Sequence, residues 1–329
     1  MQHFEDGQSP PPDLRRDPRA EPSAAVKILV TGIRGFIGAA IATAAHAQGH
    51  EVVGVDLLSR GRALPHGVRV VQGDVANPTA WRGELDAVDV IFHSAALHHT
   101  DQIAHDPVKS IEVNLRGTRL MLEMAAECRV PRFVHLSSAK VYGEPVAFPS
   151  SEEDLLSPVE PYGLAKAVSE QMCAYFAAHS AMRCVAVRPF SVYGPGQDLS
   201  TGYIGQLLHG WHTGRPVAFA GEPEYLRDFV HVDDVVRICL AAALTDHDVA
   251  VVNAGSGDAT SLRDLVTEFS SLCADGPDVR YAPARAGTIT RTLADMRRGL
   301  PLLGRPPFSL REGLVDTLRS SAPEGRVHA

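Results

Sequence analysis

A glycine-rich turn that follows a short apolar run constrains the fold of this chain more than any other feature. Lys27 to Thr31 is typical of a buried strand in a parallel sheet, and glycines follow it at positions 32, 35 and 38. Gly32 permits the tight turn, Gly35 lets the backbone approach a phosphate, and Gly38 lets the next helix pack closely on the strand. The start of that helix would present its backbone amides to a pyrophosphate.

A carboxylate stands where a dinucleotide site of this kind needs one. Asp56 ends a second apolar segment, Glu51 to Val55, and lies 18 residues after Gly38. A carboxylate there can accept both ribose hydroxyls and would repel a 2'-phosphate, which favours NAD over NADP. Together with Phe36 and Ile37 at the start of the helix, these residues predict an NAD site.

The composition argues against several other classes of protein. The chain has 329 residues, enough for a large α/β core and a smaller lobe, and its net charge of -8 without a basic run argues against nucleic acid as a partner. Its five cysteines contain no CxxC pair, and its histidines lack zinc-site spacing, so no metal site is predicted. No apolar run is long enough to span a membrane, and residues 1–25 lack the apolar segment of a signal peptide. We expect a cytoplasmic protein with a disordered leader at 1–25.

From Val26 onward, apolar strands alternate with helical patterns. This order predicts a Rossmann-type, doubly wound parallel sheet covered by helices on both faces. We expect an NAD-binding domain at residues 26–190, to which 228–254 return, and a substrate-binding lobe from 191–227 and 255–329. The expected strands are 27–31, 51–55, 68–72, 88–93, 132–137 and 183–189, with helices at 106–128, 162–179 and 232–244, and short strands near 216–219 and 250–253. After Pro189 the pattern otherwise breaks into loops rich in glycine and proline.

A tyrosine and a lysine four residues apart form the second chemical feature. Tyr162 and Lys166 would share one face of a helix, so that the ammonium lies near the phenol. A free phenol has a pKa of about 10, and lowering it by about 3 units requires roughly 4 kcal/mol of preferential stabilisation of the phenolate. Lys166 and an oxidised nicotinamide are both positive and would favour the phenolate. Tyr162 could then take a proton from a hydroxyl group while hydride leaves the same carbon.

Two hydroxyl groups, Ser137 and Ser138, end a further strand at the edge where ligands of open α/β sheets bind. With them the chain resembles an extended short-chain dehydrogenase/reductase of the NAD-dependent epimerase/dehydratase family, whose members act on nucleotide sugars. The resemblance covers nearly everything from Val26 to Arg319, in the expected order. Its further marks are Gly73-Asp74, His93-Ser-Ala-Ala96, Asn114, Gly117-Thr118, Arg188-Pro189, Tyr193-Gly-Pro195, Arg227-Asp-Phe-Val-His-Val-Asp-Asp234 and Asn253-Ala-Gly255.

The resemblance implies roles for residues around the cofactor. Asp74 would meet the adenine ring, and Ala95-Ala96 would line the dinucleotide. Ser138 would form a hydrogen bond with the reacting sugar oxygen and would exchange protons with Tyr162. Asn114 would be mainly structural, although it could also be a helix amide without function. The residues expected to contact NAD are Gly32, Gly35, Phe36, Ile37, Gly38, Asp56, Asp74, Val75, Ala95, Ala96, Asn114, Tyr162, Lys166 and Pro189.

The substrate contacts implied by the resemblance are spread along the chain. Arg227 and Arg285 match two arginines that hold the substrate diphosphate, a role suited to forked guanidinium donors. Phe219 falls where an aromatic ring often packs on the nucleotide base, but a core phenylalanine on a short strand would look the same. Ser191 replaces an asparagine often found in this loop, and Lys140 adds a positive charge at the rim of the site, beside the sugar-binding Ser138.

The residues after Ser138 bear on the type of reaction. Family members that eliminate water resemble one another in carrying an acid pair there, because one group removes the C5 proton and another protonates the leaving hydroxyl. This chain has Ala139-Lys140 instead. C4 epimerisation is therefore favoured over dehydration and decarboxylation. It would proceed by hydride removal from C4 by NAD, rotation of the 4-keto sugar about its diphosphate, and hydride return to the opposite face.

Several alternatives stay open at the level of the sequence. Lys140 could be a second acid/base group or could reach solvent. The protein could be a dehydratase or reductase of a deoxysugar or antibiotic pathway, and a non-catalytic NAD sensor is a distant alternative that the intact Tyr162 and Lys166 oppose. The nucleotide base and the sugar are undetermined. In most relatives the helices at 106–128 and 162–179 pair across a two-fold axis, which implies a homodimer.

Overall fold

A seven-stranded sheet, parallel throughout, forms the centre of the protein. The structure is a computed structural model that describes residues 25–58, 61–97, 106–244, 250–273, 275–284 and 287–321. The strand order is β10-β6-β5-β4-β1-β2-β3, so the direction of winding reverses between β1 and β4. This topology confirms the predicted Rossmann-type fold. The strands are β1 (Lys27–Thr31), β2 (Glu51–Asp56), β3 (Arg69–Gln72), β4 (Val90–His93), β5 (Arg132–Leu136), β6 (Arg183–Pro189) and β10 (Val251–Ala254).

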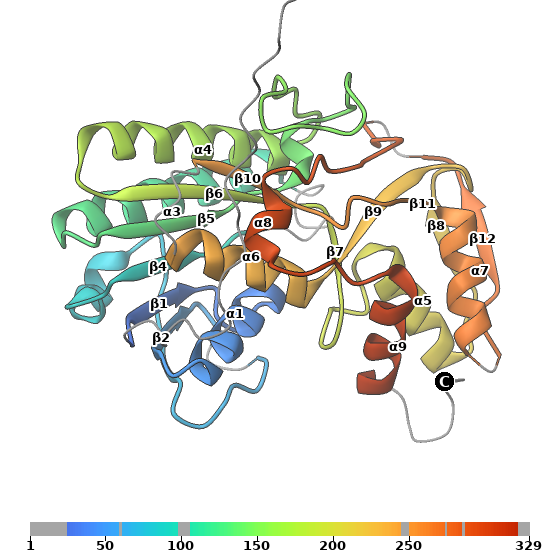
Figure 1. Ribbon diagram of the computed structural model, residues 1–329, viewed down its shortest axis with the longest axis horizontal. Coiled ribbons are helices and arrows are strands. Elements are labelled where there is room, and N and C mark those ends of the chain that lie inside the picture. The colour runs from blue at the N-terminus through green and yellow to red at the C-terminus, as the bar shows by residue number, and fades with distance from the viewer. Residues whose placement is uncertain are drawn as a thin grey trace, which may run out of the picture.

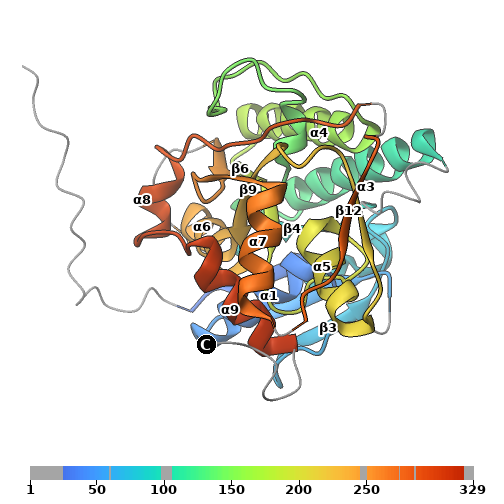
Figure 2. The ribbon, with the colours of Figure 1, turned by 90° about the vertical axis from the view of Figure 1, so that its right-hand side faces the viewer.

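Helices cover both faces of this sheet. The helices α1 (Phe36–Ala47) and α6 (Val232–Leu244) lie on one face, and α3 (Pro107–Glu127) and α4 (Pro161–His179) lie on the other (Figures 1 and 2). The short helix α8 (Gly299–Leu303) packs against α6, and the 3-10 segment η1 (Pro78–Leu85) packs against α3. Each central strand therefore meets apolar surface on both sides, as its nearly continuous apolar sequence requires.

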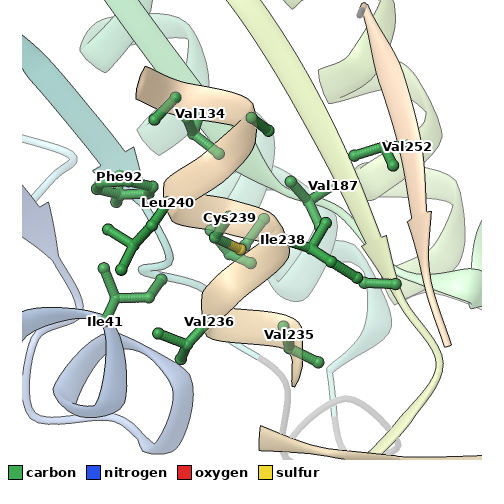
Figure 3. Close-up of a cluster of buried hydrophobic side chains, with 14 of the residues drawn as sticks. Ile41, Phe92, Val134, Val187, Val235, Val236, Ile238, Cys239, Leu240 and Val252 are labelled. Carbon is green, nitrogen blue, oxygen red and sulfur yellow. The ribbon is translucent and has the colours of Figure 1, made fainter. Parts of the chain in front are cut away.

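Side chains of the central strands alternate between the two helical layers. On β4, Val90 and Phe92 belong to the core beneath α1 and α6, whereas Ile91 belongs to the core beneath α3 and α4. Figure 3 shows the first of these cores, with Leu240 of α6 beside Phe92 and Ile41 of α1 close by. Burying such side chains contributes about 1.5–3 kcal/mol each. Both layers are thereby fixed to the sheet whose edge carries the site.

A second lobe is built after β6. In it β7 (Ser191–Tyr193), β9 (Leu226–His231) and β11 (Ala259–Ser261) form one small sheet, and β8 (Val217–Ala220) pairs with β12 (Val279–Ala282). The helices α5 (Gly202–Thr213), α7 (Leu262–Leu272) and α9 (Leu310–Ser321) pack around them, at the right of Figure 1. The lobe has a core of its own, which includes Phe219, Leu265 and Leu314.

The helix α5 corrects the expectation of loops after Pro189. Its buried residues Ile204, Leu207, Leu208 and Trp211 follow helical spacing. The helix ends at Gly214, whose φ of 66° is left-handed and favours glycine. Glycines at both ends of a short apolar segment make it look like a loop, although the apolar spacing within it is helical.

Three expectations of the sequence concern the whole chain. The leader at 1–25 lies outside the described residues except for Ala25. The division into two domains stays a prediction, with which the return of β10 to the main sheet and of α6 to its face agrees. In the part of the chain that the structure describes, every helix is too short or too polar to cross a membrane.

Candidate active site

The loops that leave β1, β2, β4 and β5 converge on one edge of the sheet. Because these strands are parallel, their carboxyl ends bring together the glycine turn, Asp56, Ala95-Ala96 and Ser138. The strand order reverses between β1 and β4, which is where open α/β sheets form a crevice for ligands. The residues predicted for cofactor and catalysis therefore share one location.

The glycines of the turn provide the space that the sequence predicts. A methyl group added to Gly32, whose φ is +69°, would lie 2.8 Å from the backbone of Ala95. One added to Gly38 would lie 2.3 Å from the carbonyl oxygen of Gly32, so a side chain there would push α1 off the turn. Gly35 caps α1, and among the described residues a methyl group there would approach the Gly32 carbonyl alone, at 3.1 Å. The backbone at the start of α1 is therefore free of side-chain bulk at this position, as the approach of a phosphate requires.

The carboxylate of Asp56 is fixed beside this turn. One oxygen accepts the backbone N–H of Arg34 at 2.8 Å, and the other accepts that of Leu58 at 3.0 Å. Each oxygen keeps a further lone pair for a ribose hydroxyl. Asp74, which follows β3, is exposed and accepts the backbone N–H of Ala76 at 2.8 Å. An open helix start and a fixed carboxylate at the end of β2 together fit NAD.

Buried polar side chains hold the end of β4. His93 lies between the hydroxyls of Thr31, at 2.8 Å, and Thr118, at 3.2 Å, and burial lowers its pKa to about 3. The imidazole is therefore neutral. Asn114 on α3 accepts the backbone N–H of Leu97 at 2.7 Å and donates to the carbonyl of the same residue at 3.0 Å. These two hydrogen bonds fix the loop that follows β4, which supports the structural role expected for Asn114.

The two serines after β5 have different partners. Ser137 is buried and donates to the carboxylate of Glu170. Ser138 is half-buried, and its hydroxyl oxygen accepts the backbone N–H of Lys140 at 3.2 Å as the cap of a short 3-10 helix, η2 (Ala139–Val141). The capping bond uses the Ser138 oxygen as an acceptor, so its proton can be donated to a substrate oxygen. This arrangement supports Ser138 as the catalytic serine.

Tyr162 and Lys166 lie on the first two turns of α4, as expected. The Lys166 ammonium donates to the carbonyl of Leu136 and lies 5.6 Å from the centre of the Tyr162 ring. Burial lowers the pKa of Lys166 to about 8. Burial, with a further effect of the Glu160 carboxylate, raises the pKa of Tyr162 above its ordinary value. The protein alone therefore holds the phenol neutral, and further positive charge at the site is needed to make it a base.

Lys140 also lies beside the tyrosine. Its ammonium is 2.6 Å from Oε1 of Glu160 and 5.6 Å from the centre of the Tyr162 ring. The Lys140 side chain is 45% exposed, so it is accessible from solvent and yet held at the rim of the site. The ion pair with Glu160 was not predicted from the sequence, and the choice between an acid/base group and a lysine that reaches solvent stays open.

A buried ion pair behind the site was missed by the sequence analysis. Arg188 on β6 donates to both carboxylate oxygens of Glu170, at 2.9 and 2.6 Å. The guanidinium also donates to the hydroxyl of Tyr142 at 2.9 Å, and that hydroxyl donates to Asn253 on β10 at 2.7 Å. Glu170 lies one turn after Lys166 on α4, and this spacing was the one signal that could have indicated its role.

Arg227, expected at the substrate diphosphate, is engaged with backbone in this structure. It is 8% exposed, and its two terminal nitrogens donate to the carbonyls of Leu226, Ile289 and Thr290. Its guanidinium carbon lies 5.5 Å from the centre of the Tyr203 ring. Arg227 therefore holds the segment 289–290 against β9, and these bonds use part of its five N–H donors.

The other predicted contacts of the substrate lobe are placed unevenly. Phe219 is fully buried and meets Tyr203 edge-on at 4.8 Å between ring centres, which favours its interpretation as a core residue. Ser191 is half-buried on β7, and Pro189 is buried at the end of β6. Arg285 lies outside the described residues.

Comparison with known proteins gives the family. The model of the NAD-dependent epimerase/dehydratase family matches residues 28–255, from β1 through the end of β10. The chain belongs to this family. Membership in the NAD-dependent epimerase/dehydratase family confirms both the resemblance and the prediction of NAD as the cofactor.

Individual relatives extend beyond the matched domain. The UDP-glucose 4-epimerase of Mycolicibacterium smegmatis is 33% identical over 306 residues, 89% of this chain and 97% of that protein. The structure of MoeE5 in complex with UDP-glucose and NAD is 34% identical, with a TM-score of 0.80 over 89% of this chain and 98% of MoeE5. UDP-glucose 4-epimerase of Thermotoga maritima with UDP-glucose is 30% identical, with a TM-score of 0.82 and the same coverage. Dehydratases of nucleotide sugars are also among the relatives.

Proposed function

We propose that this protein is an NAD-dependent epimerase that inverts C4 of a nucleotide-diphosphate hexose. The observation that carries the proposal is the pair of residues after Ser138, at the carboxyl end of β5. Ala139 and Lys140 stand there in place of an acid pair, while Ser138 and Tyr162 are both present. Dehydration needs carboxyl groups for the C5 proton and the leaving hydroxyl, whereas C4 inversion needs one base at one hydroxyl. The UDP-glucose 4-epimerases among the relatives support the same choice.

The catalytic residues would act on a single oxygen. Tyr162, as phenolate, takes the proton of the 4-hydroxyl, and Ser138 donates a hydrogen bond to the same oxygen. Lys166, held by the Leu136 carbonyl, keeps a positive charge near the phenolate. Bound NAD would accept the hydride from C4 and return it to the other face of the sugar. The same tyrosine then returns the proton, so that no second acid is required.

The predicted cofactor contacts follow the sheet edge. The start of α1, with Gly35, Phe36 and Ile37, would face the pyrophosphate, and Asp56 would accept the ribose hydroxyls. Asp74 and Val75 would meet the adenine ring. The remaining contacts would come from Gly32, Gly38, Ala95, Ala96, Asn114, Tyr162, Lys166 and Pro189.

The sugar nucleotide would lie between the sheet edge and the second lobe. Ser138 and Lys140 would border the sugar, and Ser191, Arg227 and Arg285 are proposed for the diphosphate. Phe219 was the residue expected at the base from the sequence. Arg227 would reach the diphosphate with a donor outside its bonds to the segment 289–290, or by exchanging one of those bonds. The buried position of Phe219 argues that another residue contacts the base.

We also infer a homodimer and a cytoplasmic location. The helices α3 and α4 carry exposed apolar side chains, among them Val113, Leu164 and Tyr175, that a two-fold partner could cover. Met124, by contrast, is buried in the core of the monomer. The five cysteines are free thiols, which suits a reducing compartment. A strictly monomeric mass by light scattering at micromolar concentration would contradict the dimer.

A dehydratase or reductase of nucleotide sugars is the second candidate, because dehydratases are among the relatives. A protein that only senses NAD is opposed by the presence of Ser138 at the start of η2 and of Tyr162 and Lys166 on α4. The experiment that separates these functions is incubation of the purified protein with UDP-, GDP-, dTDP- and CDP-sugars, with products identified by mass and NMR. An epimerase changes configuration without changing mass and needs no added reductant. A product lighter by one water would identify a dehydratase.

A further inference from the structure

Two of the four lysines in this chain lie beside Tyr162. The chain has 27 arginines, so arginine is its ordinary cation. The ammonium groups of Lys140 and Lys166 each lie 5.6 Å from the centre of the tyrosine ring. A lysine supplies a compact point charge, whereas an arginine favours planar, forked partners. The phenol therefore has two compact positive charges near it, of which Lys166 alone belongs to the expected catalytic group.

The partner of Lys140 is a carboxylate that works against the base. Glu160 stands just before the first turn of α4, and its Oε1 is shielded from solvent at 2.6 Å from the Lys140 ammonium. A negative charge at a helix N-terminus stabilises the helix. The same charge lies two residues before Tyr162 and raises the pKa of that phenol. Glu160 therefore supports α4 but opposes formation of the phenolate.

Backbone packing fixes the distance between the segments that carry Lys140 and Glu160. A methyl group added to Gly163 would lie 2.6 Å from the carbonyl oxygen of Lys140 and 3.2 Å from Cβ of Pro158. The 3-10 helix η2 therefore lies directly against the first turn of α4, and a side chain at position 163 would separate them. Lys140 and Glu160 therefore extend from two segments whose backbones are in contact.

We propose that Lys140 and Glu160 form a matched pair of positioning residues, in which the lysine cancels the repulsion that the glutamate exerts on the Tyr162 phenolate and so sets the pH range of the base. The inference rests on the proposed role of Tyr162. Among the described residues, the charged groups that face the tyrosine are Lys166 and Glu160 from α4 and Lys140 from η2. Neither member of the pair transfers a proton to substrate. Because the pair is partly exposed, each charge should shift the titration of the phenol by about one pH unit.

The test is a titration of Tyr162 in the NAD-loaded protein. Phenolate is followed by ultraviolet difference absorbance, with the Tyr162→Phe protein as the reference, and the pH dependence of kcat is measured in parallel. Lys140→Met should move the midpoint up by about one unit, because Glu160 is then uncompensated. Glu160→Gln should move it down by a similar amount, and the double variant should titrate close to the wild type. Lys140→Arg, which keeps the charge, should also stay close to the wild type.

The matched control is Lys27→Met, since this lysine lies at the amino end of β1, away from the site, and should leave the midpoint unchanged. The proposal is overturned if Lys140→Met and Glu160→Gln leave the midpoint in place or move it in the same direction. It is also overturned if Lys140→Met and Lys140→Arg both lose kcat equally at every pH, since this would mean that Lys140 itself transfers a proton. The absorbance titration needs no sugar substrate, so an error in the proposed reaction would not affect it. A Tyr162 that stays neutral at every pH at which the protein is folded would contradict its role as the base and, with it, the pair.

Discussion

Arg188 and Glu170 form a buried ion pair that joins β6 to α4, the helix that carries Tyr162, the proposed catalytic base. Two hydrogen bonds of 2.6 and 2.9 Å connect the side chains, and each side chain is 4% exposed. Glu170 also accepts a hydrogen bond from the hydroxyl of Ser137, which follows β5. The pair therefore ties α4 to two neighbouring strands of the sheet, just behind Tyr162 and Lys166.

Breaking this pair should destabilise the whole protein. Arg188→Met leaves the Glu170 carboxylate buried without its counter-charge, and we expect the free energy of unfolding to fall by about 3–5 kcal/mol. A double variant, Arg188→Met with Glu170→Leu, should lose less than the sum of the two single variants, because no uncompensated charge remains. Urea unfolding of the wild type, the two single variants and the double variant measures this. A loss below about 1 kcal/mol in Arg188→Met would show that the pair is not a structural link.

Asp56 should determine both the affinity for the cofactor and its type. Asp56→Ala removes the acceptor for the ribose hydroxyls, and we expect NAD binding to weaken by about 1–3 kcal/mol. The difference between the affinities for NAD and NADP should become smaller. The same change frees the backbone N–H groups of Arg34 and Leu58. Asp56→Asn keeps the shape and one of the two acceptors, so comparing it with Asp56→Ala shows how much of the loss comes from the loosened turn. Calorimetric titration of both dinucleotides is the measurement, and a wild-type protein that prefers NADP would refute this role of Asp56.

Two buried histidines should make the protein sensitive to acid. Burial lowers the pKa of His93 to about 3, and it lowers that of His135 well below its ordinary 6.5. As pH falls from 6.5 toward 3, the unfolded chain takes up protons at these rings and the folded protein does not. Stability should therefore fall with pH in this window, by about 1.4 kcal/mol per pH unit for each histidine.

His135→Leu tests that acid sensitivity. Both ring nitrogens of His135 lack a hydrogen-bond partner among the described residues, so an apolar replacement of similar size should cost little stability near neutral pH. The variant should lose less stability than the wild type when urea unfolding is repeated at about pH 5. Equal losses in the two proteins would show that His135 does not contribute to the pH dependence.

Tyr162→Phe should remove catalysis and leave binding. The change keeps the ring beside Lys140 and Lys166 but deletes the proton acceptor, so we expect turnover to fall by about two to four orders of magnitude. Affinity for the nucleotide sugar, measured by calorimetry, should stay within a few-fold of the wild type. Turnover that survives the substitution would assign the base to another residue.

The sequence predicted the main sheet well because its signals are local. Three consecutive apolar residues in β1, followed by glycines at which a side chain would clash, define a strand, a turn and a helix without reference to the rest of the chain. The helix ends are equally local, as with Asp106, which caps α3, and Pro161, which occupies the first turn of α4. The second lobe was predicted poorly, because its short strands pair only with partners distant in sequence, as β8 does with β12.

The site shows the same division. Tyr162 and Lys166 are recognisable because four residues of one helix fix their relation, and Asp56 is recognisable because it ends a strand next to the glycine turn. The contact between Arg188 and Glu170 depends on how α4 lies on β6, which spacing along the chain does not reveal. Arg227 and Phe219 were placed by resemblance, and packing within the second lobe puts both in buried positions.

The proposed C4 inversion is tested most directly by running the reaction in heavy water. The nucleotide sugar identified in the substrate panel would be converted by the wild-type protein, and the product analysed for deuterium by mass and NMR. Inversion at C4 predicts product without deuterium at any sugar carbon, because the hydrogen on C4 leaves and returns as hydride. Deuterium at C3 or C5 would contradict the proposal, because it would show that the reaction passes through an enolised 4-keto sugar, as in 3,5-epimerisation or dehydration.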